Sequence, residues 1–130
     1  MFVVVGLLRR RPDLDPAAFR RYYETHHRRL GEKYLAGYAV RYLRRYLTPF
    51  PDPITGRPTE PDCDVILEIW YPDRATFERA SRRLSEPAVA AEIAADEERL
   101  FDRPANRFYF VDEVESTLPD PPSHAQGGEP

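Results

Sequence analysis

Four short segments of the chain have the hydrophobic patterns of β-strands. Residues 2–8 and 107–114 are apolar on both alternating faces, which is typical of strands that are buried on both sides. Residues 38–47 and 63–71 show a period of two, and arginines collect on one face of the segment 38–47. We therefore predict four strands over these ranges.

The segment that follows the first predicted strand has a helical period. In residues 15–30, the residues of one face recur at steps of four, four and three. Asp15 followed by Pro16 is typical of a helix start, because Asp can cap free N–H groups and Pro needs no donor at the first position. Gly31 and Gly37 bracket the predicted exit from this helix. The face carries Phe19, Tyr23, His27 and Leu30, with Tyr34 four residues further on.

Two more helices are predicted between the third and fourth strands. The first begins at Pro72–Asp73 and carries Phe77, Ala80 and Leu84. The second begins near residues 85–87, and one stripe of it carries Val89, Ile93, Glu97 and Leu100.

The predicted order β-α-β-β-α-β is the ferredoxin-like arrangement, an α+β fold with a four-stranded antiparallel sheet. Helices in this arrangement cover one face of the sheet only. Because the first and last strands are apolar on both faces, the other face needs a partner. We expect a homodimer in which two sheets pack face to face, about 10 Å apart.

Two segments lie outside this pattern. Residues 48–62 contain five prolines and a glycine, and this loop is close to the length of about 12–15 residues above which unstructured loops are usually functional or mobile. Residues 116–130 are rich in proline, glycine and polar residues, and we expect them to be a disordered tail in which His124 is solvated. Residues 1–115 then form a single domain.

Composition narrows the function classes. The net charge is −3 with a pI of about 5.6, and carboxylates are interspersed among the 18 arginines, so nucleic-acid binding is disfavoured. The single Cys63 rules out an intrachain disulfide and suits the cytoplasm. The apolar N-terminal run is too short to span a membrane. We expect a cytoplasmic protein without membrane or nucleic-acid partners.

His27 is the most suggestive position for chemistry. It is a titratable imidazole on the apolar face of the predicted helix, which fits either a buried structural histidine or a general acid–base group. The neighbouring His26 lies about 100° round the helix, so the two rings cannot bind one metal. No metal site is expected.

Carboxylates on the third strand and the last helix are further candidates. Asp64, Glu68 and Trp70 share a strand face with Ile66, which fits polar groups in an apolar pocket. The alternative is ion pairing with Arg41 or Arg45 of the neighbouring strand. Glu97, on the stripe of the last helix, could orient a histidine or pair with an arginine.

The chain resembles the EthD family of the dimeric α+β barrel superfamily over residues 2–115. The helix pattern F-x-x-Y-[YW]-x-x-x-H-x-x-L of that family is present from Phe19 to Leu30. The later matches are Arg41-Tyr42, the run from Asp64 to Trp70, and Asp96-Glu97 followed by Phe101-Asp102. The sequence departs from the family pattern at Arg29, where proline is usual.

The resemblance implies a dimeric α+β barrel that acts without a cofactor on a hydrophobic aromatic or polyketide-type molecule. It implies His27 as the catalytic residue for proton transfer in a dehydration, cyclisation or isomerisation. Two alternatives stay open, a non-catalytic dimer that binds a hydrophobic metabolite and a cofactor-free monooxygenase. The residues expected to bind the substrate are Tyr23, Arg41, Asp64, Glu68, Trp70 and Glu97.

Overall fold

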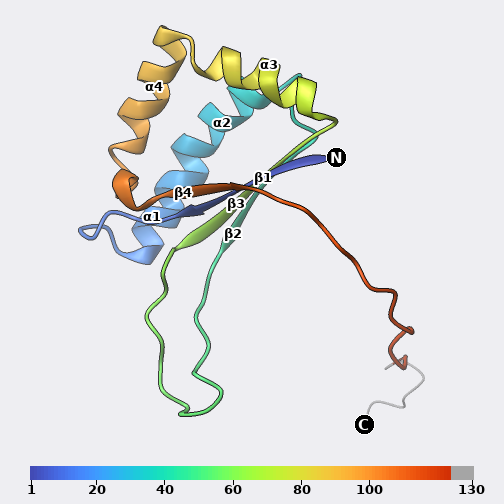
Figure 1. The fold of residues 1–130 in the computed structure, drawn as a ribbon. Coiled ribbons are helices and arrows are strands. Elements are labelled where there is room, and N and C mark those ends of the chain that lie inside the picture. Colours follow the sequence, from blue (N-terminus) through green and yellow to red (C-terminus); the bar gives the residue numbers. More distant parts are fainter. Residues whose placement is uncertain (124–130) are drawn as a thin grey trace.

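A computed structural model describes residues 1–123 of the chain; the end of the predicted tail, including His124, lies outside the described residues. Four strands form one antiparallel sheet in the order β2-β3-β1-β4, with β1 and β3 in the centre (Figure 1). This is the ferredoxin-like topology predicted from the pattern. The strands are β1 (Phe2–Leu8), β2 (Arg41–Tyr46), β3 (Val65–Tyr71) and β4 (Arg107–Phe110).

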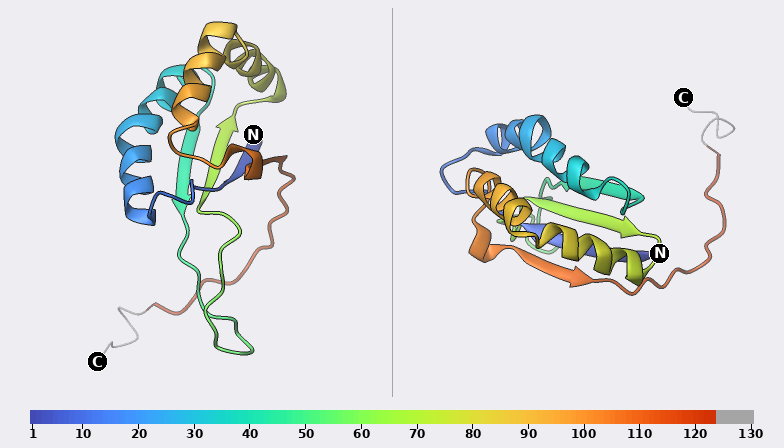
Figure 2. Two further views of the ribbon diagram at one scale, coloured as in Figure 1. Left: turned by 90° about the vertical axis from the view of Figure 1, so that its left-hand side faces the viewer. Right: turned by 90° about the horizontal axis from the view of Figure 1, so that it is seen from above.

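All the main helices lie on one face of this sheet (Figure 2). The first helical segment consists of α1 (Pro16–Tyr22), a π-helical turn η1 (Tyr23–His27) and α2 (Arg28–Leu35). Asp15 caps α1 by accepting a hydrogen bond from the N–H of Ala18, and Asp73 caps α3 in the same way through Thr76. The remaining helices are α3 (Arg74–Leu84), α4 (Pro87–Glu97) and the short 3₁₀ helix η2 (Arg103–Ala105).

The first helical segment differs from its prediction in two ways. It continues beyond Leu30 to Leu35, and a π turn interrupts it. Gly31 was predicted to lie at the exit, but it is helical, and its missing side chain leaves room for Tyr42. A Cβ at Gly31 would lie 2.5 Å from the Tyr42 hydroxyl oxygen. The first strand has the predicted bounds, whereas the other three predicted strands are longer than those observed. In β4, for example, pairing with β1 involves only Val4 to Leu7.

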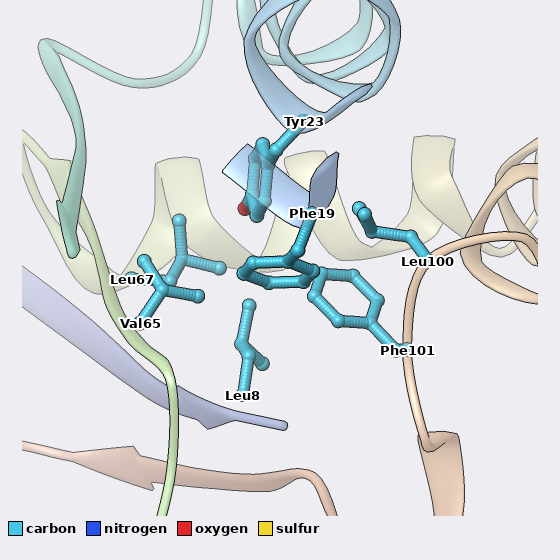
Figure 3. Packing of buried hydrophobic residues seen from close by; sticks show 7 residues of the cluster. All are labelled: Leu8, Phe19, Tyr23, Val65, Leu67, Leu100 and Phe101. Atoms are coloured by element: carbon cyan, nitrogen blue, oxygen red, sulfur yellow. The ribbon is translucent and has the colours of Figure 1, made fainter. Parts of the chain in front are cut away.

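The core fills the space between the sheet and the first helical segment (Figure 3). Phe19 and Tyr23 are almost fully buried, and the ring of Phe19 meets Tyr23 edge-on at 6.0 Å between centroids. Burying one such side chain stabilises a fold by about 1.5–3 kcal/mol. The buried cluster consists of Leu8, Phe19, Tyr23, Val65, Leu67, Leu100 and Phe101.

Strand alternation decides which residues meet the helices. On β3, Val65, Leu67 and Ile69 pack into the core, so the residues between them lie on the opposite face. The strand register places further apolar residues on that open face. The open face carries Val3, Val5, Leu7, Leu43, Ile66, Trp70 and Tyr109, together with Arg41, Arg45, Glu68 and Arg107.

The connection between β2 and β3 extends away from the body as a long arm (Figure 1). At its tip, Asp52 accepts hydrogen bonds from the N–H groups of Ile54 and Thr55, at 2.8 and 3.1 Å. Phe50 and Ile54 are 72% and 92% exposed. Residues 111–123 likewise contain no helix or strand and lead away from the sheet.

Candidate functional site

The π turn η1 places two functional side chains on the inner face of the first helical segment. Tyr23 and His27 begin and end the turn, and both are buried. Their rings meet edge-on with 5.2 Å between centroids. A π turn inserts an extra residue into a helix and often marks a functional site. Here it aims a phenol and an imidazole at the same space under the helix.

His27 is held by a carboxylate from the last helix. Its Nδ1 lies 2.7 Å from Oδ2 of Asp96, and the Tyr22 hydroxyl donates to Oδ1 of the same carboxylate at 2.5 Å. Because a carboxylate can only accept, Nδ1 carries a hydrogen, and in the neutral ring Nε2 keeps a free lone pair. The arrangement fixes both the tautomer and the orientation of the imidazole.

The other side of His27 borders a partly enclosed cavity of about 190 Å³ between the helices and the sheet. An apolar cavity of about 150 Å³ can hold benzene, so this space suits one aromatic ring or a small fused pair. Its polar lining is Tyr23, His27, Tyr34, Tyr42 and Glu97. Its apolar lining is Leu8, Leu30, Gly31, Leu35, Leu67, Ile69, Leu84, Ile93, Phe101 and Phe108.

Burial changes the acidity of three of these lining groups. Desolvation raises the pKa of Glu97, and the positive charge of Arg103, whose Nε lies 3.2 Å from Oε1 of Glu97, acts against that rise. Burial also raises the pKa of Tyr23 well above its ordinary value and that of Tyr42 to a smaller extent. Both phenols therefore stay protonated and can act as hydrogen-bond donors.

An ion pair under the π turn anchors it to the sheet. Arg44 of β2 donates to both carboxylate oxygens of Glu24, at 3.0 and 2.8 Å, and the Tyr46 hydroxyl donates to the same carboxylate at 2.6 Å. These hydrogen bonds lower the pKa of Glu24. The pair joins η1 to β2 beside the cavity.

On the outer side, Asp96 borders a groove between α2 and α4 of about 460 Å³. His26 lies in this groove, where its ring stacks on Tyr22 and its Nδ1 is 2.8 Å from the Thr25 hydroxyl. The Asp96 carboxylate thus separates the inner cavity, which His27 borders, from an outer groove that is open to solvent.

The structure brings together three of the seven site residues predicted from the sequence: Tyr23, His27 and Glu97. The other four lie away from His27, because strand alternation turns them to the face without helices or to its edge. Glu68 accepts hydrogen bonds from Arg45 and Trp70, at 2.8 and 3.0 Å. Arg41 stacks over the Trp70 ring at 4.7 Å, and Asp64 binds Arg10.

The sequence did not single out two of the residues that contact or orient the imidazole. Asp96 holds His27, whereas the hydrophobic stripe of the last helix had pointed to its neighbour Glu97. Tyr22 completes the group through Asp96. Both residues lie in the segments that carry the family resemblance. That resemblance was the one feature of the sequence that could have pointed to them. Among residues 1–123, no group of three or more His, Cys, Asp or Glu side chains could hold a metal ion.

Comparisons with known proteins agree with this fold. The family model described as the EthD domain matches residues 11–104. An EthD family protein from Bacillus halodurans C-125 superposes with a TM-score of 0.59 and 18% identity, covering 88% of this chain and 100% of that one. An EthD-like protein from Ralstonia eutropha JMP134 gives 0.60 and 16%, covering 89% and 95%.

More distant structures share the fold as well. HapK from Hahella chejuensis superposes with a TM-score of 0.52 at 14% identity, covering 93% of this chain and 100% of that one. The comparison with curated proteins returns no match. No helix in residues 1–123 is long and apolar enough to cross a membrane. Since the family model covers most of the sequence, the chain belongs to the EthD family.

Proposed function

We propose that this protein is a cofactor-free enzyme that moves a proton on a hydrophobic aromatic or polyketide-type molecule, in a dehydration, cyclisation or isomerisation. The observation that carries the proposal is His27, which is fixed through Nδ1 by Asp96 and borders an apolar cavity. Proton transfer by a positioned imidazole contributes roughly 10²–10⁴ to a reaction rate.

The residues have separate roles in this proposal. Nε2 of His27 removes a proton from the carbon next to a carbonyl group, and Asp96 stabilises the imidazolium that forms. The Tyr23 hydroxyl donates a hydrogen bond to the substrate, and the apolar lining binds its ring. The cavity of about 190 Å³ favours one ring or a small fused pair over a long polyketide.

The cavity and the carboxylate favour this proposal over a purely binding role. A non-catalytic protein would be favoured by a tightly packed interior in which His27 bonded only to the backbone. Here the partner of His27 is the side chain of Asp96, and a cavity lies beside the ring.

We also propose that the protein works as a homodimer in the cytoplasm. The support for the dimer is the open sheet face, where Val5 and Leu7 of β1 lie beside Ile66 of β3 with no helix above them. A second copy covering this face would also bury the Arg41–Trp70 stack and Glu68, which gives these predicted site residues a role at the interface. The single cysteine fits a reducing compartment.

The test uses 1-tetralone, a bicyclic aromatic ketone, as a probe. Loss of its α-proton signal in D₂O, followed by NMR, measures proton abstraction directly. We expect the parent protein to accelerate this exchange and His27→Ala to lose about 10²-fold or more of the acceleration. His26→Ala is the matched control, because His26 lies in the outer groove, and it should keep the parent rate.

Two results would contradict the proposal. One is a parent protein that exchanges the probe no faster than buffer, and the other is a folded His27→Ala variant with the parent rate. Oxygen uptake with a hydroquinone probe, measured in parallel with an electrode, would instead favour the monooxygenase alternative.

A further inference from the structure

A second apolar pocket lies beside the inner cavity, between α3 and β4. Its volume is about 280 Å³, and we call it the β4 pocket. It is lined by Val4, Phe77, Phe108, Tyr109 and Phe110. We propose that the β4 pocket is the second half of the substrate site, where it binds an apolar substituent of the aromatic molecule whose carbonyl end lies at His27. This inference rests on the proposed function and extends it to the shape of the substrate.

Phe108 joins the two spaces. It lines the inner cavity as well as the β4 pocket, yet it is 58% exposed. A residue that both lines a partly enclosed cavity and meets solvent lies at the mouth of that cavity. The Phe108 ring lies close over Gly6 of β1, because a Cβ at Gly6 would be 2.9 Å from its Cε1 atom. The missing side chain at Gly6 therefore lets the ring lie against the sheet at this mouth.

The order of the strands places the mouth across the cavity from His27. All four strands contribute to the cavity lining, from Tyr42 on β2 to Phe108 on β4, and β2 and β4 are the two edges of the sheet. His27 belongs to η1, which the pair of Glu24 and Arg44 joins to β2. A molecule with its carbonyl group at His27 therefore points its far end toward Phe108 and the β4 pocket.

The size and lining of the β4 pocket suit an apolar group. The rings of Phe77 and Phe110 meet edge-on with 5.4 Å between centroids, and Phe110 is 62% exposed. Contiguous exposed apolar surface of this kind often marks a ligand-binding groove. Since a cavity of about 150 Å³ can hold benzene, a pocket of about 280 Å³ has room for one further ring or a short alkyl chain.

The second copy that we propose on the open face of the sheet would leave this pocket free. Phe108 and Phe110 lie opposite Gly6 and Val4 in the strand register, and Val4 packs against a cluster that includes Leu35 of α2. Phe108 and Phe110 therefore face the helix side of the sheet. A ligand can occupy the β4 pocket in the dimer as well as in the monomer.

Two probes that differ only in their substituent test the inference. They are 1-tetralone and 6-phenyl-1-tetralone, in which the phenyl group is para to the carbonyl group and points away from the reacting end. An apolar group that fits an apolar pocket changes specificity by about 10-fold or more. We expect calorimetric titration of the parent to show about 10-fold or more tighter binding of the phenyl-substituted probe.

Exposed phenylalanines provide a matched pair of variants. Phe110 lines the β4 pocket, whereas Phe50 lies on the arm between β2 and β3 and is 72% exposed. We expect Phe110→Ala to reduce the preference for the phenyl-substituted probe to about 3-fold or less, and Phe50→Ala to keep the parent preference. In the parent, intermolecular NOEs should connect the phenyl substituent to ring protons of Phe110 and Phe77.

The outcomes separate this inference from the proposed function. Equal affinity of the parent for the two probes would overturn the inference, and so would a preference that Phe110→Ala leaves unchanged. Tighter binding of the phenyl-substituted probe that depends on Phe110, without α-proton exchange of either probe, would overturn only the proton transfer. If the parent binds neither probe, both fail together.

Discussion

At His27, the sequence indicated the position of the residue but not its partner. Spacing placed the imidazole on an apolar face, and the structure buries it there beside a cavity. Its partner Asp96 lies 69 residues away, and no local pattern links the two. A hydrophobic stripe identifies which helix face is buried, but it cannot tell which of two adjacent carboxylates at the edge of that face turns toward another helix.

The Asp96–His27 hydrogen bond leads to a prediction that needs no substrate. In Asp96→Asn, the amide N–H can donate to Nδ1, which would move the imidazole hydrogen to Nε2 and block its role as a base. We expect ¹⁵N NMR to show a protonated Nδ1 in the parent and loss of that state in the variant, with probe exchange slowed by roughly 10²–10⁴.

The ring nitrogens of His26 serve as the internal control for this substitution. His26 has a separate partner in Thr25 and should keep its signals. An unchanged tautomer of His27 together with an unchanged exchange rate would show that Asp96 does not orient the base.

Gly31 leads to a prediction about packing. A Cβ there would meet the hydroxyl oxygen of Tyr42 at 2.5 Å and its Cζ at 2.7 Å, so the ring must shift into the cavity or the helix must move. We expect Gly31→Ala to lower the free energy of unfolding by about 1–3 kcal/mol, measured by urea denaturation. In a Tyr42→Phe background, which removes the nearest clashing atom, the cost should be smaller. Equal stability of Gly31→Ala and the parent would contradict this contact.

Among the elements, the strands followed from the pattern more directly than the first helix did. Alternation fixes a strand and its faces, and the four strands appear where the pattern predicted them, with β1 at its predicted length and the other three shorter. The π turn has no such signal, because Tyr23 and His27 are four residues apart and would share a face in an ordinary α-helix as well. The inward position of Arg44 on β2 likewise became visible only with its partner Glu24.

The Glu24–Arg44 pair that holds η1 to β2 predicts a pH-dependent stability. Arg44 lowers the pKa of Glu24 in the folded state, so the pair stabilises the fold above the ordinary glutamate pKa of about 4.3 and loses this contribution as the pH falls below it. We expect Glu24→Gln to cost about 1–2 kcal/mol at pH 7, less than a fully buried pair, because 34% of the Glu24 side chain is exposed.

Denaturation at pH 7 and at about pH 3 checks this effect. The difference between the parent and Glu24→Gln should shrink at the lower pH. Glu32→Gln, which removes the more exposed partner of Arg28 on the neighbouring α2, is the control and should change stability little at either pH. A difference between the parent and Glu24→Gln that does not vary with pH would contradict the role of the pair.

For the whole molecule, the order of elements was enough to predict the topology, because two β-α-β units with apolar strands have few ways to cover one sheet face. The order of elements did not predict which of the candidate site residues lie on the helix-covered face of the sheet and which lie on the open face. Alternation groups Glu68 with Trp70 and Leu67 with Ile69, but it does not say which group meets the helices.

The open face predicts the oligomeric state. Val5 lies in its centre, paired with Glu68 on one side and Tyr109 on the other. We expect light scattering at micromolar concentration to give twice the chain mass of 15.1 kDa for the parent, and the single-chain mass for Val5→Arg. Ala91→Arg, on the exposed side of α4, should remain a dimer. A monomeric parent would contradict the proposal.

Chemical rescue is the most direct measurement of whether His27 transfers a proton inside the cavity. His27→Ala leaves a space beside the cavity into which free imidazole can enter. We expect 1-tetralone exchange to be lost in this variant and to return in a saturable way as imidazole is added, with no such effect on the parent. Exchange at the parent rate in His27→Ala without imidazole would contradict proton transfer by His27.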